Sequence, residues 1–516
     1  MTQLALFVMF VKSRHAFGDG IVDADGTCCL QRRDFNMRFC SLWLSLVALV
    51  IGDQNIAFAQ KPALNDSISR RGEETWAVAK QIWQFAEPGY QETQSSKLLA
   101  DTLEKAGFVV KRGVADIPTA FTATYGEGKP VIGIMGEYDA LPGLSQQAVP
   151  EQLPREGASY GHGCGHHMFG AASMSAAIAI AEQIKAGQIR GTVRFYGCPA
   201  EEGGSGKTFM VRAGLFNDCD AALHWHPSSR NSAGDGSCLA RAAVKFRFKG
   251  TSAHAAGSPD LGRSAVDAVE LAAHASELMR EHTPDFTRIH HVITAGGGAP
   301  NVVPDFGEVF FYLRHPKAEI VKELYPRLLK CAQGAALATD TKLEEVYLGG
   351  TMEIMPNETL AQVAMNNLKH LNDLKYTPEE LEFAARIQST LIKPLPLDTL
   401  TQVFNTSTDV GKGSTDVGDV SWVVPTTGFT TSCYVPGTGA HSWQAVAAGG
   451  MSIGRNGMQL AARTMAATAW DLFQQPETLA AAKAEFAKRL EGRKYDPLLL
   501  PGQKAPLDYR NSPVAQ

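Results

Sequence analysis

The sequence Val131-Ile132-Gly133-Ile134-Met135 decides the fold class. This apolar run has the length of a strand and no polar alternation, as a strand buried on both faces of a sheet does. A second strand is expected at residues 191–197, after an Ala-rich helical stretch at 168–186, and Ala221-Ala222-Leu223 starts a third. Strands that alternate with helices predict an α/β domain in which helices cover both faces of a mixed sheet.

The pattern changes near residue 236. Residues 241–249 alternate polar and apolar side chains, as a half-exposed antiparallel strand does. The elements expected after this strand are a helix at 264–282, strands at 290–294 and 307–314, and a helix at 318–336. This order predicts a small α+β domain at 236–349, inserted into an α/β domain made of 60–235 and 350–516.

The amino terminus has the features of an export signal. Met37-Arg38 begins a short basic segment, an apolar run follows at 40–51, and Ala57-Phe58-Ala59 provides a cleavage site. The apolar run is shorter than the roughly 20 residues that a membrane-spanning helix needs. We therefore expect translation to start at Met37, cleavage after Ala59 and a periplasmic protein, with a retained membrane anchor as the alternative.

Composition excludes several classes of protein. The 516 residues contain 48 Lys and Arg against 53 Asp and Glu, so a basic surface for nucleic acid is not expected. Neither a nucleic acid nor a membrane is predicted as a partner. Export permits disulfides, but the cysteines that remain after cleavage show no dense framework, and their pairing is left open: Cys164, Cys198, Cys219, Cys238, Cys331 and Cys433.

The densest cluster of chemically active residues is Gly161-His162-Gly163-Cys164-Gly165-His166-His167. The glycines let the backbone turn so that Cys164 and His166 point to one spot, and thiolate with imidazole suits zinc or a similar metal. His162 and His167 are not both expected as ligands beside them. The alternative is a Gly-rich surface loop with incidental histidines.

Four further loops carry His, Asp or Glu, and three of them directly follow predicted strands. Adjacent carboxylates such as Glu201-Glu202 can divide the work, with one binding a metal while the other acts as a general base. Because open α/β sheets place ligands at the carboxyl ends of their strands, a shared metal site is the simplest interpretation. The loops are Glu137–Pro142, Pro199–Gly204, His224–Pro227 and the later segment Pro436–Trp443.

These motifs, together with Asn301-Val302-Val303-Pro304-Asp305, resemble those of the aminoacylase and carboxypeptidase-type metallohydrolases, in particular their amidohydrolase branch. The resemblance covers residues 73–473. It implies a zinc-peptidase-like α/β catalytic domain with an inserted lid domain through which two subunits dimerise. It also implies two divalent metal ions, Zn or Mn, and leaves a related partner subunit open.

The resemblance assigns roles to residues of the α/β domain. Glu201 is implied as the general base. Asp139 is implied to fix the orientation of a metal ligand without binding the metal itself. One ligand assignment stays open between His226, which we favour, and His224. The residues implied as metal ligands are Cys164, His166, Glu202, His226 and His441.

The resemblance also assigns residues of the inserted domain and of a nearby loop. His254 is implied as the residue that stabilises the oxyanion across a dimer, with an ordinary turn histidine as the alternative. Asn301 and Arg314 are implied to bind substrate, although Arg314 would equally suit a strand-end salt bridge. Ser414 lies in a loop implied to form the substrate pocket, with helix capping as the alternative.

The predicted function is metal-dependent hydrolysis of the amide bond of an N-acyl or N-aroyl amino acid, such as an aminobenzoyl-glutamate-like molecule. A dipeptide or a long-chain N-acyl amino acid is the alternative substrate. A catalytically silent metal-binding scaffold is the alternative from another class, and the presence of Glu201 argues against it. A thiol hydrolase that uses Cys164 without a metal is a third possibility, which sensitivity to chelators would test.

Overall fold

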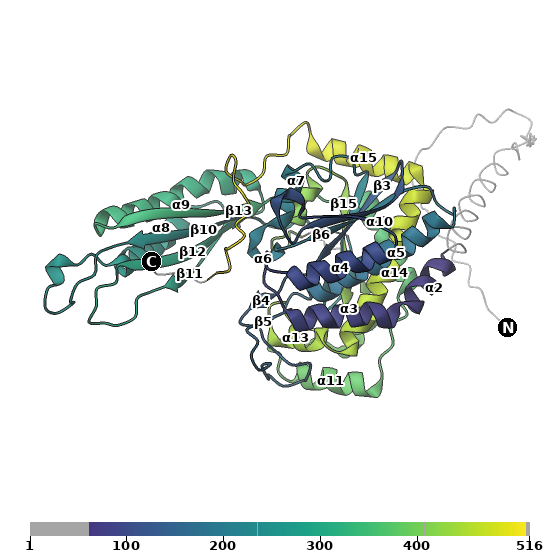
Figure 1. The fold of residues 1–516 in the computed structure, drawn as a ribbon, viewed down its shortest axis with the longest axis horizontal. Helices are drawn as coiled ribbons and strands as arrows, with labels where there is room; N and C mark the ends of the chain where they lie inside the picture. Colours follow the sequence, from purple (N-terminus) through teal and green to yellow (C-terminus); the bar gives the residue numbers. More distant parts are fainter. Residues whose placement is uncertain (1–60, 235, 406–408, 512–516) are drawn as a thin grey trace, which may run out of the picture. The chain divides into compact units, whose positions relative to one another are not determined.

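The computed structural model describes residues 61–234, 236–405 and 409–511. Within them the chain forms an α/β domain and an inserted α+β domain, as the sequence predicts (Figure 1). The predicted start at Met37 and cleavage site after Ala59 lie outside the described residues.

The α/β domain is built on a six-stranded mixed sheet with the order β1-β2-β6-β3-β7-β15. Strand β3 pairs in parallel with β6 and β7, and β15 pairs in parallel with β7, whereas β2 is antiparallel to β6 and to β1. All seven residues of β3 are buried, which confirms the expectation for the apolar run. The strands are β1 (Val109–Arg112), β2 (Phe121–Glu127), β3 (Val131–Glu137), β6 (Gly191–Cys198), β7 (Ala221–Leu223) and β15 (Thr426–Thr427).

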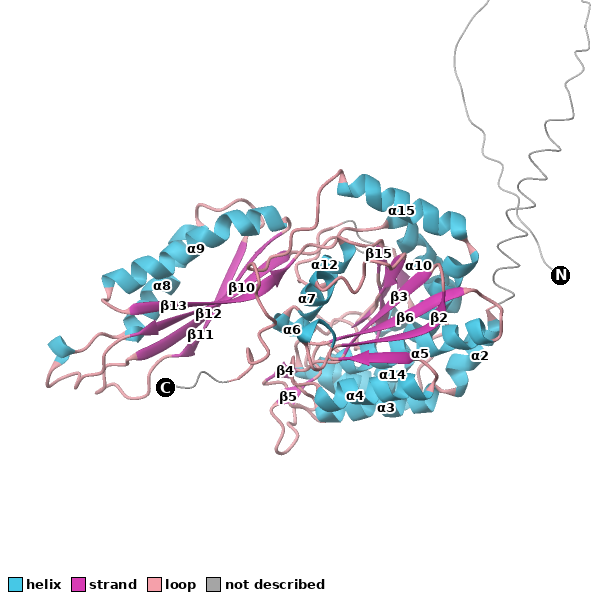
Figure 2. Ribbon diagram, turned by 45° about the horizontal axis from the view of Figure 1, so that its top comes forward, coloured by secondary structure: helices cyan, strands magenta, loops and turns pink. Residues whose placement is uncertain are grey.

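Helices cover both faces of this sheet (Figure 2). One face packs against a large helical layer around the Ala-rich helix α5, and its side chains include Ile132, Ile134 and Phe195. The other face, with Met135 and Tyr196, packs against two short helices, α7 and α12. The helices are α2 (Pro62–Arg70), α3 (Gly72–Phe85), α4 (Thr93–Lys105), α5 (His166–Lys185), α6 (Glu201–Gly204), α7 (Gly206–Arg212), α10 (Glu358–Leu371), α11 (Pro378–Gln388), α12 (Val417–Ser421), α13 (Trp443–Gly449), α14 (Ser452–Gln474) and α15 (Pro476–Leu490).

Several very short strands complete the α/β domain. A four-stranded sheet with the order β14-β9-β16-β8 begins its strand β8 at His226 and so fixes the backbone of that residue. Strands of two to four residues carry too little periodicity to be recognised in a sequence. They are β4 (Leu141–Pro142), β5 (Tyr160–Gly161), β8 (His226–Ser228), β9 (Asn231–Ala233), β14 (Val403–Phe404) and β16 (Phe429–Ser432).

The inserted domain is a four-stranded antiparallel sheet, β11-β12-β10-β13, with α8 and α9 packed on one face. The predicted order of strand, helix, two strands and helix is confirmed, and a fourth strand follows it. Because β13 pairs with β10 along its whole length, the sheet continues past the predicted boundary at residue 349. The elements are β10 (Ala240–Lys249), α8 (Ala265–Arg280), β11 (Arg288–Ala295), β12 (Phe306–His315), α9 (Ala318–Ala338) and β13 (Lys342–Thr351).

The prediction that residues 241–249 form a half-exposed strand is wrong. Seven of the first eight positions of β10 are buried on both faces of the sheet. The polar face is covered in part by the C-terminal segment, which we define as residues 491–511. The Lys245 Nζ atom donates to the carbonyl of Tyr509 at 3.2 Å, and the Tyr347 hydroxyl donates to the carbonyl of Leu498 at 3.1 Å. Alternation predicts one polar face correctly, but it does not reveal what covers that face.

Two observations bear on the cysteines and on membranes. All six cysteines of the described residues are free thiols: Cys164, Cys198, Cys219, Cys238, Cys331 and Cys433. Across residues 61–511, leaving aside the gaps in the description, we find no helix long and apolar enough to cross a membrane.

Candidate metal centre

The predicted loops meet at one edge of the six-stranded sheet. Strands β3, β6 and β7 are parallel, so they end at the same edge, and the loops with Asp139, Glu201 and His224 follow directly after them. The Gly-rich loop before α5 and the late loop with His441 reach the same place. One cavity of about 1010 Å³ is lined by residues of all of these segments.

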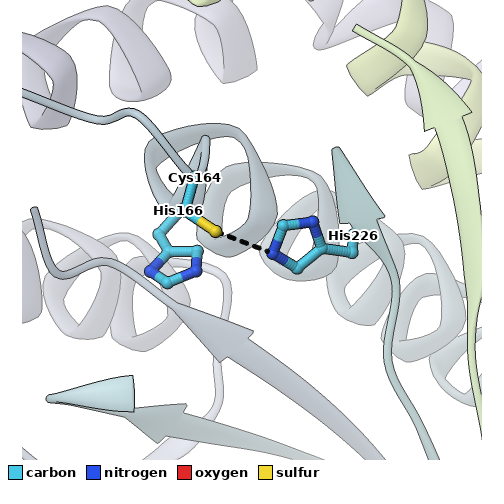
Figure 3. Close-up of side chains that lie close together, drawn as sticks. All are labelled: Cys164, His166 and His226. Atoms are coloured by element: carbon cyan, nitrogen blue, oxygen red, sulfur yellow. Dashed lines mark hydrogen bonds between the residues drawn. The ribbon is translucent and has the colours of Figure 1, made fainter. Parts of the chain in front are cut away.

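Cys164 and His166 lie at the amino terminus of α5, facing His226 (Figure 3). Gly165 precedes the helix with a φ of +76°, and a Cβ atom there would lie 2.4 Å from the Tyr434 hydroxyl, so this turn requires glycine. The Cys164 Sγ atom lies 3.4 Å from His226 Nε2. One donor atom from each of these three side chains lies within 4.8 Å of the others.

A second donor group consists of Cys164, Glu202 and His441, again with all three donor atoms within 4.8 Å. The His441 Nε2 atom lies 2.9 Å from Glu202 Oε1. The late loop reaches Cys164 because the His441 amide donates to the Gly163 carbonyl at 2.9 Å. A Cβ at Gly163 would lie 3.2 Å from the His441 Cα atom, so glycine allows this close approach. The two donor groups share Cys164.

The donor atoms fit a divalent metal. His166 Nε2 is buried and has no hydrogen bond, although Glu137 Oε2 lies 3.1 Å from it. Buried polar atoms without hydrogen bonds are rare and call for an explanation. Sulfur, imidazole nitrogen and carboxylate oxygen are the ligands that zinc takes in proteins.

The protonation of the donors also suits metal binding. Burial, and then the nearby His166, lower the pKa of His226 to about 3, so its ring is neutral. Burial opposes ionisation of Glu202, but its bond and attraction to His441 bring its pKa down to about 2. Burial, and then the Glu202 carboxylate, raise the pKa of the Cys164 thiol well above its ordinary value. A bound divalent cation deprotonates such a thiol.

Asp139 has the contacts expected of a residue that orients ligands. Its Oδ1 atom lies 2.8 Å from His166 Nδ1, and its Oδ2 atom accepts a hydrogen bond of 2.9 Å from the Glu202 amide. A carboxylate on one ring nitrogen directs the other nitrogen toward a metal. Asp139 therefore contacts two different ligand positions at once.

Glu201 is buried beside the donor groups. One of its carboxylate oxygens lies 4.0 Å from His166 Nε2. Burial, and then the adjacent Glu202 carboxylate, raise the pKa of Glu201 well above its usual range. A carboxylate with a raised pKa, next to a metal site, is suited to accept a proton at neutral pH.

The loop that carries Glu201 is held in a strained conformation. Ala200 adopts a φ of +55° although it is not a glycine. Its amide donates to buried Glu92 at 2.7 Å, and the Tyr90 hydroxyl donates to the Gly204 carbonyl at 2.6 Å. Strain of this kind persists only where surrounding contacts enforce it, and it clusters at functional sites.

A buried ion network that the sequence did not reveal lies behind the site. Lys207 Nζ is 2.6 Å from Glu137 and 2.6 Å from Asp416, and all three side chains are buried. Burial disfavours the charge on Lys207, but Asp416 and Glu137 outweigh it and raise its pKa. Glu137 also forms a third donor group with His166 and Glu201. A lysine inside a helical stretch gives no signal by which sequence reasoning finds such a network.

Arg314 and Ser414 lie in the cavity, as predicted. The Arg314 Nη1 atom donates to Ser414 Oγ at 3.3 Å. No carboxylate among the described residues forms an ion pair with Arg314, so a strand-end salt bridge does not explain it. Ser414 does not cap α12, whose first turn follows Asp416. Both residues line the cavity.

The structure does not bring His254 and Asn301 to the cavity of the same chain. Both are exposed, and the Asn301 carbonyl accepts a hydrogen bond from Ala255, so the two residues share one end of the inserted domain. Arg241 and the loop with His254 lie at opposite ends of β10, and ten strand residues span roughly 30 Å. For His254 the predicted action is across a dimer, so the roles of both residues at the site stay predictions.

The other histidines of the predicted loops differ in whether they can bind a metal. His226 belongs to a donor group and His224 does not, although both line the cavity. His162 Nε2 bonds the Ile82 carbonyl at 3.0 Å, and His167 Nε2 bonds the Gly449 carbonyl at 3.0 Å. Both are buried, so they support the loop rather than bind metal, and the favoured assignment of His226 agrees with the geometry.

A family model supplies independent evidence. Residues 133–447 match the model of peptidase family M20/M25/M40, which is more than half of the chain. The chain belongs to this family. It is also 41% identical, over 84% of its length and 96% of the relative's, to one of the subunits of the p-aminobenzoyl-glutamate hydrolase of Escherichia coli.

More distant relatives of this M20 protein share its fold. It is 27% identical to the human Xaa-Arg dipeptidase, over 83% of this chain and 92% of that one. A solved structure of a dinuclear metal binding peptidase from the M20 family of Bacillus subtilis matches with a TM-score of 0.53 and 17% identity, covering 79% of this chain and 99% of that one. Membership of the M20 family and the donor groups together show that this chain is a metal-dependent hydrolase that acts on amide bonds.

Proposed function

We propose that this M20 hydrolase cleaves the amide bond of an N-acyl or N-aroyl amino acid, with an aminobenzoyl-glutamate-like molecule as the first candidate substrate. The observation that carries the proposal is the pair of donor groups that share Cys164, with Glu201 beside them and Arg314 in the same cavity. The 41% identity to a chain of a p-aminobenzoyl-glutamate hydrolase supports the substrate class.

The residues of the chain divide the reaction between them. Two divalent metals, Zn or Mn, held by the two donor groups, would supply Lewis-acid activation of water and of the substrate carbonyl. Glu201 accepts the proton of the attacking water and passes it to the nitrogen of the leaving amino acid. Arg314 binds the carboxylate of the amino acid, because a guanidinium matches a carboxylate with two parallel hydrogen bonds.

The proposed assembly is a homodimer formed through the inserted domain, with a related partner subunit as the alternative. Strand β11 lies at the edge of its sheet, and two of its apolar side chains, Val292 and Ile293, are 55% and 45% exposed. An exposed apolar edge strand is a surface on which another chain can pair. His254 and Asn301 would then reach the cavity of the partner rather than their own.

We also propose a periplasmic location, which rests on the export signal predicted from the sequence of residues 37–59. Secretion of a fusion of residues 37–59 to a reporter enzyme, followed by sequencing of the mature amino terminus, tests this point. We expect cleavage directly after Ala59, so that the mature protein begins at the first residue of the reporter. A reporter that remains inside the cell contradicts it.

The first experiment measures metal content of the mature protein and hydrolysis of a panel of N-acyl amino acids, before and after chelation. We expect close to two equivalents of metal and cleavage that chelation abolishes and added Zn or Mn restores. Cleavage that survives complete removal of metal favours a thiol mechanism at Cys164. Bound metal with no cleavage of any panel member, alone or with a related subunit, favours a silent scaffold.

A dipeptidase is the second candidate, favoured by the identity to the human Xaa-Arg dipeptidase over most of the chain. The same panel includes dipeptides with acidic, neutral and basic carboxyl-terminal residues. Faster hydrolysis of a dipeptide than of every N-acyl amino acid decides for this candidate.

A further inference from the structure

The cavity contains more arginine than a substrate with one carboxylate requires. Arg241, Arg314 and Arg510 all line it, and we call these three residues the arginine cluster. They come from strand β10, strand β12 and the C-terminal segment. Neither Arg241 nor Arg510 has a role in the reaction proposed above.

Two members of the cluster lie directly opposite each other in the inserted sheet. Arg241 pairs in register with Arg314, and their guanidinium carbons lie 4.7 and 5.3 Å from the centre of the Tyr312 ring. Like charges at directly opposed positions destabilise a sheet. Burial, and then the nearby Arg241, lower the pKa of Arg314, which reflects the same repulsion.

The third member, Arg510, also lies close to Tyr312. A Cβ at Gly203 would lie 2.8 Å from the Tyr312 hydroxyl and 3.8 Å from Arg510 Nη2, so both groups lie close to that glycine. Arg510 also donates to the Glu202 carbonyl, and the Tyr509 hydroxyl donates to the same oxygen at 2.9 Å. The C-terminal segment thereby places a guanidinium beside the metal donors.

No carboxylate of the described residues lies within ion-pair distance of the cluster, although Glu201 and Glu202 attract Arg314 from farther away. Arg241 is only 5% exposed, and the hydrogen bond of its guanidinium goes to the neutral Ser205 hydroxyl at 3.0 Å. Among the described residues, no carboxylate forms an ion pair with any member, and the Nε atom of each is buried without a hydrogen bond. Burying an unpaired charge is costly, and buried charges in proteins are therefore paired.

We infer that Arg241 and Arg510 form a second anion subsite, which binds the side-chain carboxylate of an acidic amino acid such as glutamate in the leaving part of the substrate. The inference rests on the proposed function. Arg314 suffices for the carboxylate that every amino acid product carries, so the two further guanidinium groups indicate a second carboxylate. Their planar donor pairs suit a carboxylate better than a lysine would.

The test compares pairs of substrates with one acyl group and either glutamate or glutamine as the amino acid, using metal-loaded mature enzyme. We expect the wild type to prefer the glutamate substrate in kcat/KM by roughly 10- to 100-fold, as for loss of a charged hydrogen bond. In Arg241→Gln this ratio falls to near one, because kcat/KM drops for the glutamate substrate alone. Arg241→Lys keeps the charge and is expected to show an intermediate ratio.

Arg247→Gln is the matched control. It removes a guanidinium from the same strand, but Arg247 lies outside the cavity and pairs with Glu308 at 2.7 Å. The glutamate preference should be unchanged in this variant. Arg510→Gln should lower the ratio as Arg241→Gln does, and it provides the test if substitutions at Arg241 do not fold.

Calorimetry gives a readout that does not depend on turnover. The wild type should bind the product L-glutamate more tightly than L-glutamine, and Arg241→Gln should bind the two alike. Hydrolysis of both substrates without a preference, or a preference unchanged in Arg241→Gln and Arg510→Gln, overturns the subsite and leaves the proposed function intact. Hydrolysis of no N-acyl amino acid overturns the proposed function instead.

Discussion

The two sides of the cavity balance their charges in different ways. On the α/β side, each donor has a partner of opposite character, such as Glu202 with His441 and His166 with Asp139. On the side of the inserted domain, Arg241 and Arg314 face each other with only serine hydroxyls as partners. The first side is organised for ions that the protein keeps, whereas the second is incomplete until an anion arrives.

The largest effect is expected from the general base of the α/β side. Glu201→Gln should lower kcat by about a thousandfold, as for loss of a general base, and should leave metal content unchanged. Glu202→Gln should lose metal as well as activity, because Glu202 belongs to one of the two donor groups that share Cys164, whereas Glu201 belongs to neither of these two. Metal analysis and kinetics on the two variants separate the roles, and equal metal loss in both contradicts the assignment.

The next effect distinguishes the two histidines that follow β7. His226→Ala removes a donor and should weaken metal binding by more than the roughly 100-fold that loss of a supporting partner can cost. His224→Ala, in the same loop, should retain both metals, because His224 belongs to no donor group among the described residues. Competition with a coloured chelator measures both affinities. A larger loss in His224→Ala reverses the assignment.

Much of the fold could be predicted from the sequence because its strands and helices are long and regular. The run at 131–135 predicts β3, and the Ala-rich stretch predicts α5, the central helix. The short strands β8 and β16 could not be predicted, since three or four residues show no period. The cover of β10 could not be predicted either, because it depends on residues more than 240 positions later, such as Tyr509 in contact with Lys245.

The metal donors could be predicted from their residue types, whereas the arginine cluster could not. Cysteine, histidine and glutamate next to glycine in short motifs are unusual outside metal sites, so residue type alone points to Cys164 and Glu202. An arginine on a strand such as Arg241 is ordinary in sequence, and only its register and burial give it meaning.

A smaller effect is expected from Asp139, which contacts two of the metal donor residues. Asp139→Asn keeps the size of the side chain but offers one acceptor and one donor, where His166 Nδ1 and the Glu202 amide both point toward it. We expect metal affinity to fall by about 10- to 100-fold. Asp101→Asn, a substitution at a half-buried position that lines no part of the cavity, is the control. Unchanged metal affinity in Asp139→Asn shows that the ligands hold their positions without this carboxylate.

The smallest effect concerns the anchor of the C-terminal segment that carries Arg510. Asp419 accepts hydrogen bonds from the Tyr495 hydroxyl at 2.7 Å and from the Met352 amide at 3.1 Å, so it ties this segment to α12 and to the end of β13. Burial raises the pKa of Asp419 to about 7. The folded state therefore holds this proton more tightly than the unfolded state does. The stabilisation is complete below about pH 4, the ordinary aspartate pKa, and is lost as the pH rises through 7.

Between pH 6 and pH 8 this one group should lower the free energy of unfolding by about 1 kcal/mol. Asp419→Asn, which does not titrate, should remove that part of the pH dependence, as measured by urea unfolding in the presence of a chelator so that metal binding does not contribute. Asp218→Asn is the control, because its bond with Arg194 lowers the pKa of Asp218 and keeps it ionised throughout this range. A slope in Asp419→Asn equal to that of the wild type would mean that Asp419 is already ionised at pH 6. The C-terminal segment would then be held by an ionised Asp419 carboxylate, and buried charged groups would support both sides of the cavity.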